Sequence, residues 1–460
     1  MRNLSLALLF GLAACAGPRP SVPSAASLPT LDTWRIAGVQ DADVDPTWWN
    51  LFGDPALSAL VERALANNVD IAIAATRVEQ ARAQFQLAQS QRTPDLFASA
   101  SGGRDRHVDP FGKAVDETAG QGGLTISYDL DLFGRLRNAS AAARASLLAT
   151  QAARDSVRLA IAASVAQGYI NLLALDSKLS VARRTLETRQ ASLHLVQRRA
   201  DAGYSAELEL RQAEAEFRAT EQLVPEIQLA IHQQEDGLSL LIGESPGDVI
   251  RGKTLDGLSV PHVVALLPST LLRRRPDIEE AEQQLVAADR SLDSVRASFM
   301  PDIQLNVTGG FAASTLLANP LSVFSFGGGL LETIFDGGRR RSEQSGAAAQ
   351  RDGAAFAYRK TVLNAFRETE DALAGVEFAD QQQIAIEKQR EAVAKLFLLA
   401  QNRYRAGYSP YLEQVDAERS LLQADLALVQ IRASHLAAFV SLYQALGGGW
   451  SIDTAKLSTK

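Results

Sequence analysis

The sequence predicts a mainly α-helical protein with a small β-sheet, built from two copies of one helix–strand–strand–long helix–hairpin unit. Three observations support this prediction. Two segments, 138–199 and 339–405, have the periodicity of single long helices, four segments alternate apolar and polar residues, and short motifs recur 204 to 207 positions apart. A helix of that length would extend roughly 90 Å, so we expect rod-like helices packed side by side.

The internal repeat is visible in two pairs of motifs. An Asp-Ile and a Pro-Asp dipeptide, with aspartates 25 positions apart, occur at 70 and 95 and again at 277 and 302. A Gly-Tyr-Ser turn occurs at 203–205 and at 407–409. We therefore expect these parts of the chain: a first repeat at 46–245, an equatorial connector at 246–267, a second repeat at 268–447 and a C-terminal tail at 448–460.

The N-terminus contains the only cysteine of the sequence, Cys15. A short apolar run precedes it, and Leu-Ala-Ala-Cys resembles the lipobox of bacterial lipoprotein signal peptides. We interpret 1–14 as a signal peptide, Cys15 as the lipid attachment site and 15–45 as a lipidated tether rich in Pro, Ser and Ala. Ala16 favours sorting to the outer membrane. The alternative is an ordinary signal peptide that happens to contain cysteine.

In the first repeat, Asp54 and Pro55 are suited to open a helix, and helical periodicity continues to Gln91. Two strands follow, with apolar residues at every second position of the second strand. A helix returns after the long helix, and Pro225 predicts a kink in it. The expected segments are strands at about 95–104 and 122–133, a polar loop between them that contains His107, Asp109 and Asp116, and helices at 138–199 and 208–242.

The second repeat follows the same order and ends in the helix Pro410–Leu446. This helix has two apolar seams offset by one residue, which lie ~100° apart, and Arg419 is the one charged residue in the first seam. A helix with two seams needs a neighbour on each side, as in a bundle or a closed barrel of helices. The other expected segments are a helix at 272–299, strands at about 302–312 and 322–335, and a helix at 339–405.

Composition argues against several functions. A net charge of -7 does not suit nucleic-acid binding. After the N-terminus no apolar run of about 18 residues predicts a membrane-spanning helix. The five histidines lack metal-ligand spacing, and Gly327–Gly329 is not a phosphate loop. We expect neither an enzyme nor a cofactor beyond the covalent lipid. Asp129 and Asp131 are expected on the same face of one strand. They could bind a cation there, but we favour the interpretation that they line a water-filled lumen.

The four amphipathic strands are long enough for a membrane, but four strands cannot close a barrel, and lipid does not tolerate open sheet edges. The chain must therefore oligomerise if these strands cross a membrane. The alternative is a soluble sheet packed on the helices.

Six motifs in combination resemble the outer-membrane efflux lipoproteins (NodT-type), the TolC-like outer-membrane factors of tripartite resistance-nodulation-division pumps. The resemblance covers about 48–450. The fourth strand departs from it, because Glu332-Thr333-Ile334 stands where related sequences often have a proline. We expect Glu332 to face the lumen or lie at the membrane edge. The motifs are Trp48-Trp49 with Phe52-Gly53-Asp54-Pro55, Asp129 to Arg135, Arg274 to Ile278, Ile334 to Arg339, Arg403 to Gly407 and Ala445 to Trp450.

The resemblance implies a homotrimer with a twelve-stranded β-barrel in the outer membrane and a twelve-helix α-barrel in the periplasm. It implies a periplasmic adaptor protein and an inner-membrane resistance-nodulation-division pump as partners, and a passive duct for drugs or other toxic small molecules. Two alternatives stay open: a periplasmic coiled-coil scaffold lipoprotein, and an outer-membrane duct for type I protein secretion.

The resemblance also implies site residues. The family's periplasmic constriction matches Leu412 and Asp416, with Tyr404 and Arg419 as holding contacts. A ring of three aspartates would attract cations, whereas the alternative for Asp416 is a solvated surface charge. The hairpin tips are candidates for adaptor contact, or their Gly and Ser simply cap helices. The tip residues are Gly203, Tyr204, Ser205, Gly407, Tyr408 and Ser409.

Overall fold

The computed structural model describes residues 18–28, 31–36, 44–262, 267–448 and 450. Cys15, the signal peptide and most of the C-terminal tail lie outside these residues. The chain divides into two compact units. The first unit is drawn from 1–28, 76–151 and 279–360, and the second from 29–75, 152–278 and 361–460. Two helices of 67 residues each, α4 (Arg135–Asp201) and α8 (Arg339–Arg405), contribute to both units, as the sequence predicts.

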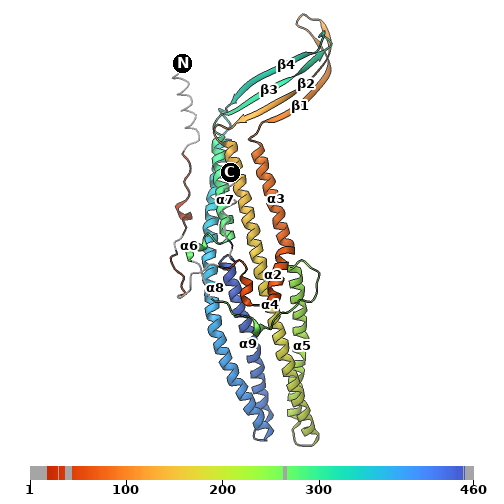
Figure 1. The fold of residues 1–460 in the computed structure, drawn as a ribbon, viewed down its shortest axis with the longest axis vertical. Helices are drawn as coiled ribbons and strands as arrows, with labels where there is room; N and C mark the ends of the chain where they lie inside the picture. The colour runs from red at the N-terminus through yellow and green to blue at the C-terminus, as the bar shows by residue number, and fades with distance from the viewer. Residues whose placement is uncertain (1–17, 29–30, 37–43, 263–266, 449, 451–460) are drawn as a thin grey trace. The chain divides into compact units, whose positions relative to one another are not determined.

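The first unit contains a four-stranded antiparallel sheet in the order β1-β2-β3-β4 (Figure 1). The hairpin of β1 and β2 is longer than expected, because backbone pairing between these strands continues beyond the point where the apolar alternation ends. His107 pairs with Val115 and Arg106 with Asp116, so the polar loop predicted around these residues is wrong and only a short turn remains. The strands are β1 (Asp95–Val108), β2 (Ala114–Leu130), β3 (Asp302–Ser314) and β4 (Leu321–Leu331).

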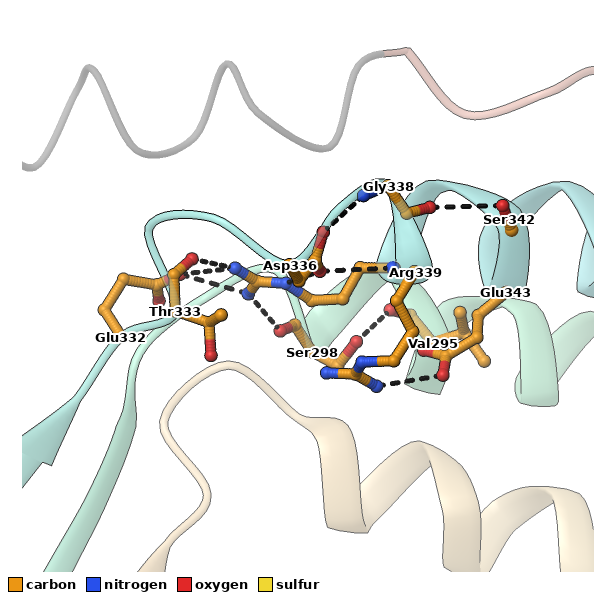
Figure 2. Close-up of polar contacts among 10 residues, drawn as sticks. Val295, Ser298, Glu332, Thr333, Asp336, Gly338, Arg339, Ser342 and Glu343 are labelled. Atoms are coloured by element: carbon orange, nitrogen blue, oxygen red, sulfur yellow. Dashed lines mark hydrogen bonds and ion pairs between the residues drawn. The ribbon is translucent and has the colours of Figure 1, made fainter.

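One aspartate caps the long helix after the sheet in each repeat. Asp131 lies just beyond β2 and accepts hydrogen bonds from the backbone N–H groups of Leu136 (3.0 Å) and Arg137 (2.7 Å). Asp336 accepts one from the N–H of Gly338 at 3.0 Å (Figure 2). These carboxylates satisfy N–H groups that have no partner inside the helix. Asp131 therefore has a capping role rather than a place on the strand face.

Glu332 lies beyond the end of β4, so the prediction that it belongs to the strand is wrong. Its carboxylate is 3.0 Å from Nη1 of Arg340, which also donates to the carbonyl of Ser298 (Figure 2). Arg340 also contacts Asp336, and the hydrogen bond that its backbone N–H donates lowers the pKa of Asp336. The strand-to-helix bend, where this sequence lacks the proline that related sequences often have, is thus held by the ion pairs of Arg340 with Glu332 and Asp336.

The tether segment 18–28 lies against two helices within the first unit. Arg19 makes ion pairs with Asp289 (2.6 Å) and Asp293 (3.0 Å) of α7 (Pro276–Ala297). The buried guanidinium of Arg351, on α8, donates to the carbonyls of Pro20 (3.1 Å) and Ser21 (3.0 Å). The segment after the expected lipid site is therefore docked on protein rather than free.

The second unit contains the returning helices α5 (Glu207–Leu241) and α9 (Tyr411–Ala445). Pro225 lies inside α5, which continues on both sides of it. The continuous helix expected from Pro55 to Gln91 is instead two helices, α2 (Pro55–Asn67) and α3 (Val69–Ser90). Asn68 causes the break: its side chain accepts from the N–H groups of Asp70 and Ile71 and donates to the carbonyl of Leu241. The remaining α-helix of the described chain is the short α6 (Pro268–Leu271).

Motif residues explain how the second unit is held together. The Trp48 ring is fully buried and stacks on Tyr443 with centroids 5.5 Å apart. Asp54 caps α2 through the N–H of Ala56 and accepts a 2.8 Å hydrogen bond from the buried hydroxyl of Tyr169. The motifs at 48–55 therefore serve packing, since Trp48 and Asp54 join this early segment of the chain to distant helices.

Two helices qualify the expectation that no helix could cross a membrane. Among the described residues, α4 and α9 each contain an 18-residue window that is long and apolar enough by composition. In the structure 56% and 39% of these windows are buried against other parts of the chain. Core helices of soluble proteins pass the same test, so these windows are weak evidence for a helical span.

Candidate functional site

The two hairpin tips of the second unit have the same backbone geometry. Gly203 and Gly407 adopt φ angles of +76° and +77°, a conformation that glycine adopts without strain. The next residue in each tip donates a backbone hydrogen bond back to its helix, Tyr204 to Arg199 at 2.8 Å and Tyr408 to Arg403 at 2.9 Å. Both glycines are thus helix C-caps.

The tip tyrosines are exposed, and the tip serines do not cap the helices that follow. Tyr204 and Tyr408 are 86% and 80% exposed. The structure gives neither returning helix a side-chain N-cap, since the capping positions are Ala206 and Pro410, so the alternative in which Ser205 and Ser409 cap these helices is wrong. Two exposed aromatic rings at the ends of two hairpins are suited to contact a partner protein.

The four predicted constriction residues do not form one group. Leu412 is 48% exposed, and Asp416 lies 3.7 Å from Arg419 on the same face of α9. Tyr404 is buried instead: its ring packs on Tyr411 with centroids 5.2 Å apart. The structure therefore brings Asp416 and Arg419 together and places Tyr404 in an apolar core.

This core joins the two hairpins near their tips. It draws buried residues from α4, α5, α8 and α9, and the Tyr404 hydroxyl has no hydrogen-bond partner among the described residues. Burial of this kind stabilises the contact between the hairpins by excluding water from apolar surface. Its buried members are Val196, Leu210, Ala213, Tyr404, Tyr411 and Val415.

A charged cluster lies next to this core, and the sequence prediction missed most of it. Arg189, Glu216 and Glu418, from α4, α5 and α9, are all buried. Nη2 of Arg189 is 2.9 Å from Oε2 of Glu216, and Nε of Arg189 is 3.5 Å from Oε1 of Glu418. Arg419 donates from Nε to Oε1 of Glu216 at 2.8 Å. Arg419 thus bonds across neighbouring helices, as the resemblance implies for a holding contact.

Burial and the like charge of Glu216 raise the pKa of the Glu418 carboxyl, whereas Arg189 lowers it. Arg189 and Arg419 fall in the apolar seams of their helices, and a charge in such a seam is a signal of a buried ion pair. The two glutamates carry no such signal, because a glutamate on a long helix usually faces water.

Metal binding has no support among the described residues, where no three His, Cys, Asp or Glu side chains are grouped closely enough to hold an ion. The ionisable cluster near the hairpin tips pairs acids with arginines. Its chemistry is that of ion pairs between helices rather than that of a reaction centre.

The fold is that of the TolC-like channel proteins. The chain superimposes on the outer-membrane channel MtrE of Neisseria gonorrhoeae, solved in its open state, with a TM-score of 0.83 and 29% identity, covering 95% of this chain and 99% of that one. It superimposes on CusC with a TM-score of 0.82 and 30% identity, covering 94% and 99%.

Residues 60–244 and 267–448 match the model of the outer membrane efflux protein family. The chain belongs to this family. It is 34% identical to the pyoverdine export outer membrane protein OpmQ of Pseudomonas aeruginosa over 475 aligned positions, which cover 100% of this chain and 99% of OpmQ. It is 32% identical to the cation efflux system protein CusC of Escherichia coli, with 94% of each chain covered. These relatives are named as export and efflux proteins, not as enzymes.

Proposed function

We propose that the chain forms the outer-membrane channel of a tripartite efflux pump, as a passive trimeric duct for drugs or other toxic small molecules. The sheet is the observation that carries this proposal. Its strands contain 14, 17, 13 and 11 residues, enough to cross a bilayer. Large apolar side chains are exposed along them, among them Leu96, Phe97, Phe311, Phe324 and Phe326.

We infer from the edges of this sheet that several copies associate, and the number three is what the family resemblance implies. In the strand order of the described chain, β1 and β4 each have a neighbour on one side only. An open edge in lipid leaves backbone groups without hydrogen bonds, which costs several kcal/mol per group. Three copies joined edge to edge would form a closed barrel of twelve strands, and their helices would continue it as a periplasmic barrel.

The partners are a periplasmic adaptor protein and an inner-membrane pump of the resistance-nodulation-division class. The exposed tips at 203–205 and 407–409 are the proposed adaptor contacts. Relatives are named for pyoverdine, toluene and cations, so the family's names give no single cargo. We infer that the pump selects the substrate and that this chain supplies the duct.

The periplasmic end of the duct is the proposed gate. Leu412 and Asp416 are exposed on α9 and are proposed to line the constriction. Arg419 holds α9 to α5, and Tyr404 stabilises the closed end through the apolar core rather than by a polar contact.

Lipid on Cys15 is proposed as the anchor of the tether. Intact-mass measurement of protein purified from membranes should show a covalent lipid addition, and Cys15→Ser should remove it. An unmodified Cys15, or cleavage elsewhere, would leave the chain without the proposed anchor.

The test of the channel is conductance of the purified, lipidated protein in a planar bilayer, after its oligomeric mass has been measured. We expect a trimer with small, cation-selective conductance. A folded protein that does not insert would instead support the periplasmic scaffold.

A further inference from the structure

The proline-rich tether segment 18–28 offers backbone carbonyl groups to its neighbours. Prolines at 18, 20 and 23 have no N–H group. Within the described chain, residues 18–22 make no hydrogen bond between backbone groups. Extended segments of this composition have no internal hydrogen bonds, so their carbonyl oxygens are available to a partner.

Arginines of two neighbouring helices bind these carbonyl oxygens. Arg296 lies near the end of α7, while Arg351 and Arg359 lie on α8. The Arg351 side chain is only 1% exposed, and a guanidinium is costly to bury without acceptors. The tether segment supplies two of these acceptors, so the site on α8 fits this segment. The hydrogen bonds join Arg296 to Pro18 (3.1 Å), Arg351 to Pro20 (3.1 Å) and Ser21 (3.0 Å), and Arg359 to Ala25.

One side chain of the tether segment adds ion pairs to these backbone contacts. Arg19 lies 2.6 Å from Asp289 and 3.0 Å from Asp293, both on α7. Asp289 also lies 3.9 Å from Nη1 of Arg351 on α8. The tether segment and α8 therefore share one carboxylate of α7, and the three parts of the chain meet there.

The two helices joined in this way carry the second hairpin of the sheet. α7 leads into β3, and β4 leads into α8. Arg340 links the two helices at the bend through the carbonyl of Ser298 (2.9 Å), and the tether segment adds a second link further along them. β4 is an edge of the sheet in the described chain, so its position depends on how α7 and α8 are held.

We propose that the tether segment is a clasp that joins α7 to α8 and holds β4 in position to pair with a neighbouring copy of the chain. The proposal rests on the proposed channel function, because β4 gains this partner only in a closed barrel of several copies. A strand that is held in advance loses less conformational freedom when it pairs, so docking of the clasp favours association. Arg19 and Arg351 are positioning residues, since they act through the two helices that carry β4.

Reversing one charge tests the clasp. Arg19→Glu sets like charge against Asp289 and Asp293, and the double variant Arg19→Glu/Asp293→Arg restores an opposite charge at one of these positions. Arg82→Glu is the matched control. Arg82 is 47% exposed, against 46% for Arg19, and pairs with a glutamate of its own helix. All variants retain Cys15, so the proposed lipid anchor is the same in each.

The first readout is docking itself, measured as the rate at which elastase cuts the membrane-bound protein within 18–28. An undocked extended segment is the preferred site of cleavage. We expect faster cleavage in Arg19→Glu and in Arg351→Gln, which removes the two carbonyl contacts. The double variant and Arg82→Glu should be cut at nearly the wild-type rate. Unchanged cleavage in both Arg19→Glu and Arg351→Gln would overturn the clasp.

The second readout is the ratio of heat-resistant oligomer to monomer after extraction in detergent. We expect Arg19→Glu to lower this ratio about tenfold, as loss of a charge-assisted hydrogen bond predicts, and the double variant to restore it. Release of the tether segment without loss of oligomer would overturn its role in holding β4. A wild-type protein that forms no oligomer would refute the channel, while the cleavage rates would still decide whether the tether segment is docked on α7 and α8.

Discussion

Arg275 donates a hydrogen bond of 2.9 Å from Nη1 to the backbone carbonyl of Ala445, 170 residues further along the chain. Its other nitrogens contact Asp277 (2.8 Å) and Glu368 (2.7 Å). One buried guanidinium thus ties the start of α7 to α8 and to the end of α9. This explains why an Arg-Pro-Asp motif opens the second repeat.

Replacing this guanidinium should destabilise the second unit. Arg275→Ala leaves the buried Ala445 carbonyl without its donor and breaks the ion pairs to two carboxylates that are 37% and 42% exposed. Because the carboxylates become solvated, the unsatisfied carbonyl is the main cost, about 1–3 kcal/mol. We expect a marked fall in apparent melting temperature, measured by circular dichroism at 222 nm. Arg273→Ala, at an exposed position three residues before the helix, is the control. Equal effects in the two variants would contradict this role.

Gly447 should not tolerate a side chain. Its φ angle is +87°, and an added Cβ would overlap the carbonyl oxygen of Arg274. Gly447→Ala should therefore cost more than about 1 kcal/mol of stability, since both strain and overlap oppose it. At Gly375, inside α8, the nearest atom to an added Cβ is that of Ala438 at 3.8 Å, so Gly375→Ala should be neutral or stabilise by up to about 1 kcal/mol. Thermal denaturation of both variants checks the contrast.

Much of the fold could be predicted because local patterns decide it. The two 67-residue helices follow from uninterrupted helical periodicity, and the strands from alternation. Asn68 could not be predicted as a break, since its cap also depends on the carbonyl of Leu241, more than 170 positions away. The outer ends of β1 and β2 lack alternation and form through backbone pairing with each other, which residue pattern does not encode.

Some residues of the candidate site could also be predicted from the sequence, and others could not. The tips were predictable, because glycine with a positive φ angle is a local requirement. Arg419 was identified through the family resemblance. Glu216 and Glu418 were not, because only the packing of three helices shows that these glutamates are buried beside Arg189.

Stability should fall in mild acid because of His435. Its ring is buried, and Nδ1 donates to Oε1 of Gln383 at 3.0 Å. Burial lowers its pKa, against the smaller opposing effect of Asp380. The folded state therefore prefers the neutral ring. The stability from this preference is present above the unfolded value of about 6.5 and is lost as the pH falls below it.

Melting temperatures measured between pH 8 and pH 5 check this prediction. We expect His435→Gln to flatten the decline of the wild-type protein around pH 6. His232→Gln should not, because the His232 side chain is 75% exposed. Parallel pH curves for wild type and His435→Gln would show that another group is responsible.

Asp416 should control ion selectivity rather than closure. The ion pair that the structure gives it is with Arg419 of the same helix at 3.7 Å, and its side chain is 63% exposed. Such a pair is worth at most about 1 kcal/mol and cannot hold two helices together.

We expect Asp416→Asn to reduce the preference for cations, measured as the reversal potential in a potassium chloride gradient, because a ring of three carboxylates would be lost. The ratio of open to closed times in single-channel recordings should stay near that of wild type, unlike in Arg419→Gln, which loses the hydrogen bond to Glu216. Glu214→Gln, which removes a carboxylate paired within α5, controls for net charge. If Asp416→Asn opened the channel as strongly as Arg419→Gln, Asp416 would itself be a closing contact, and the interhelical pairs at Arg189 and Glu216 would not suffice to hold the gate.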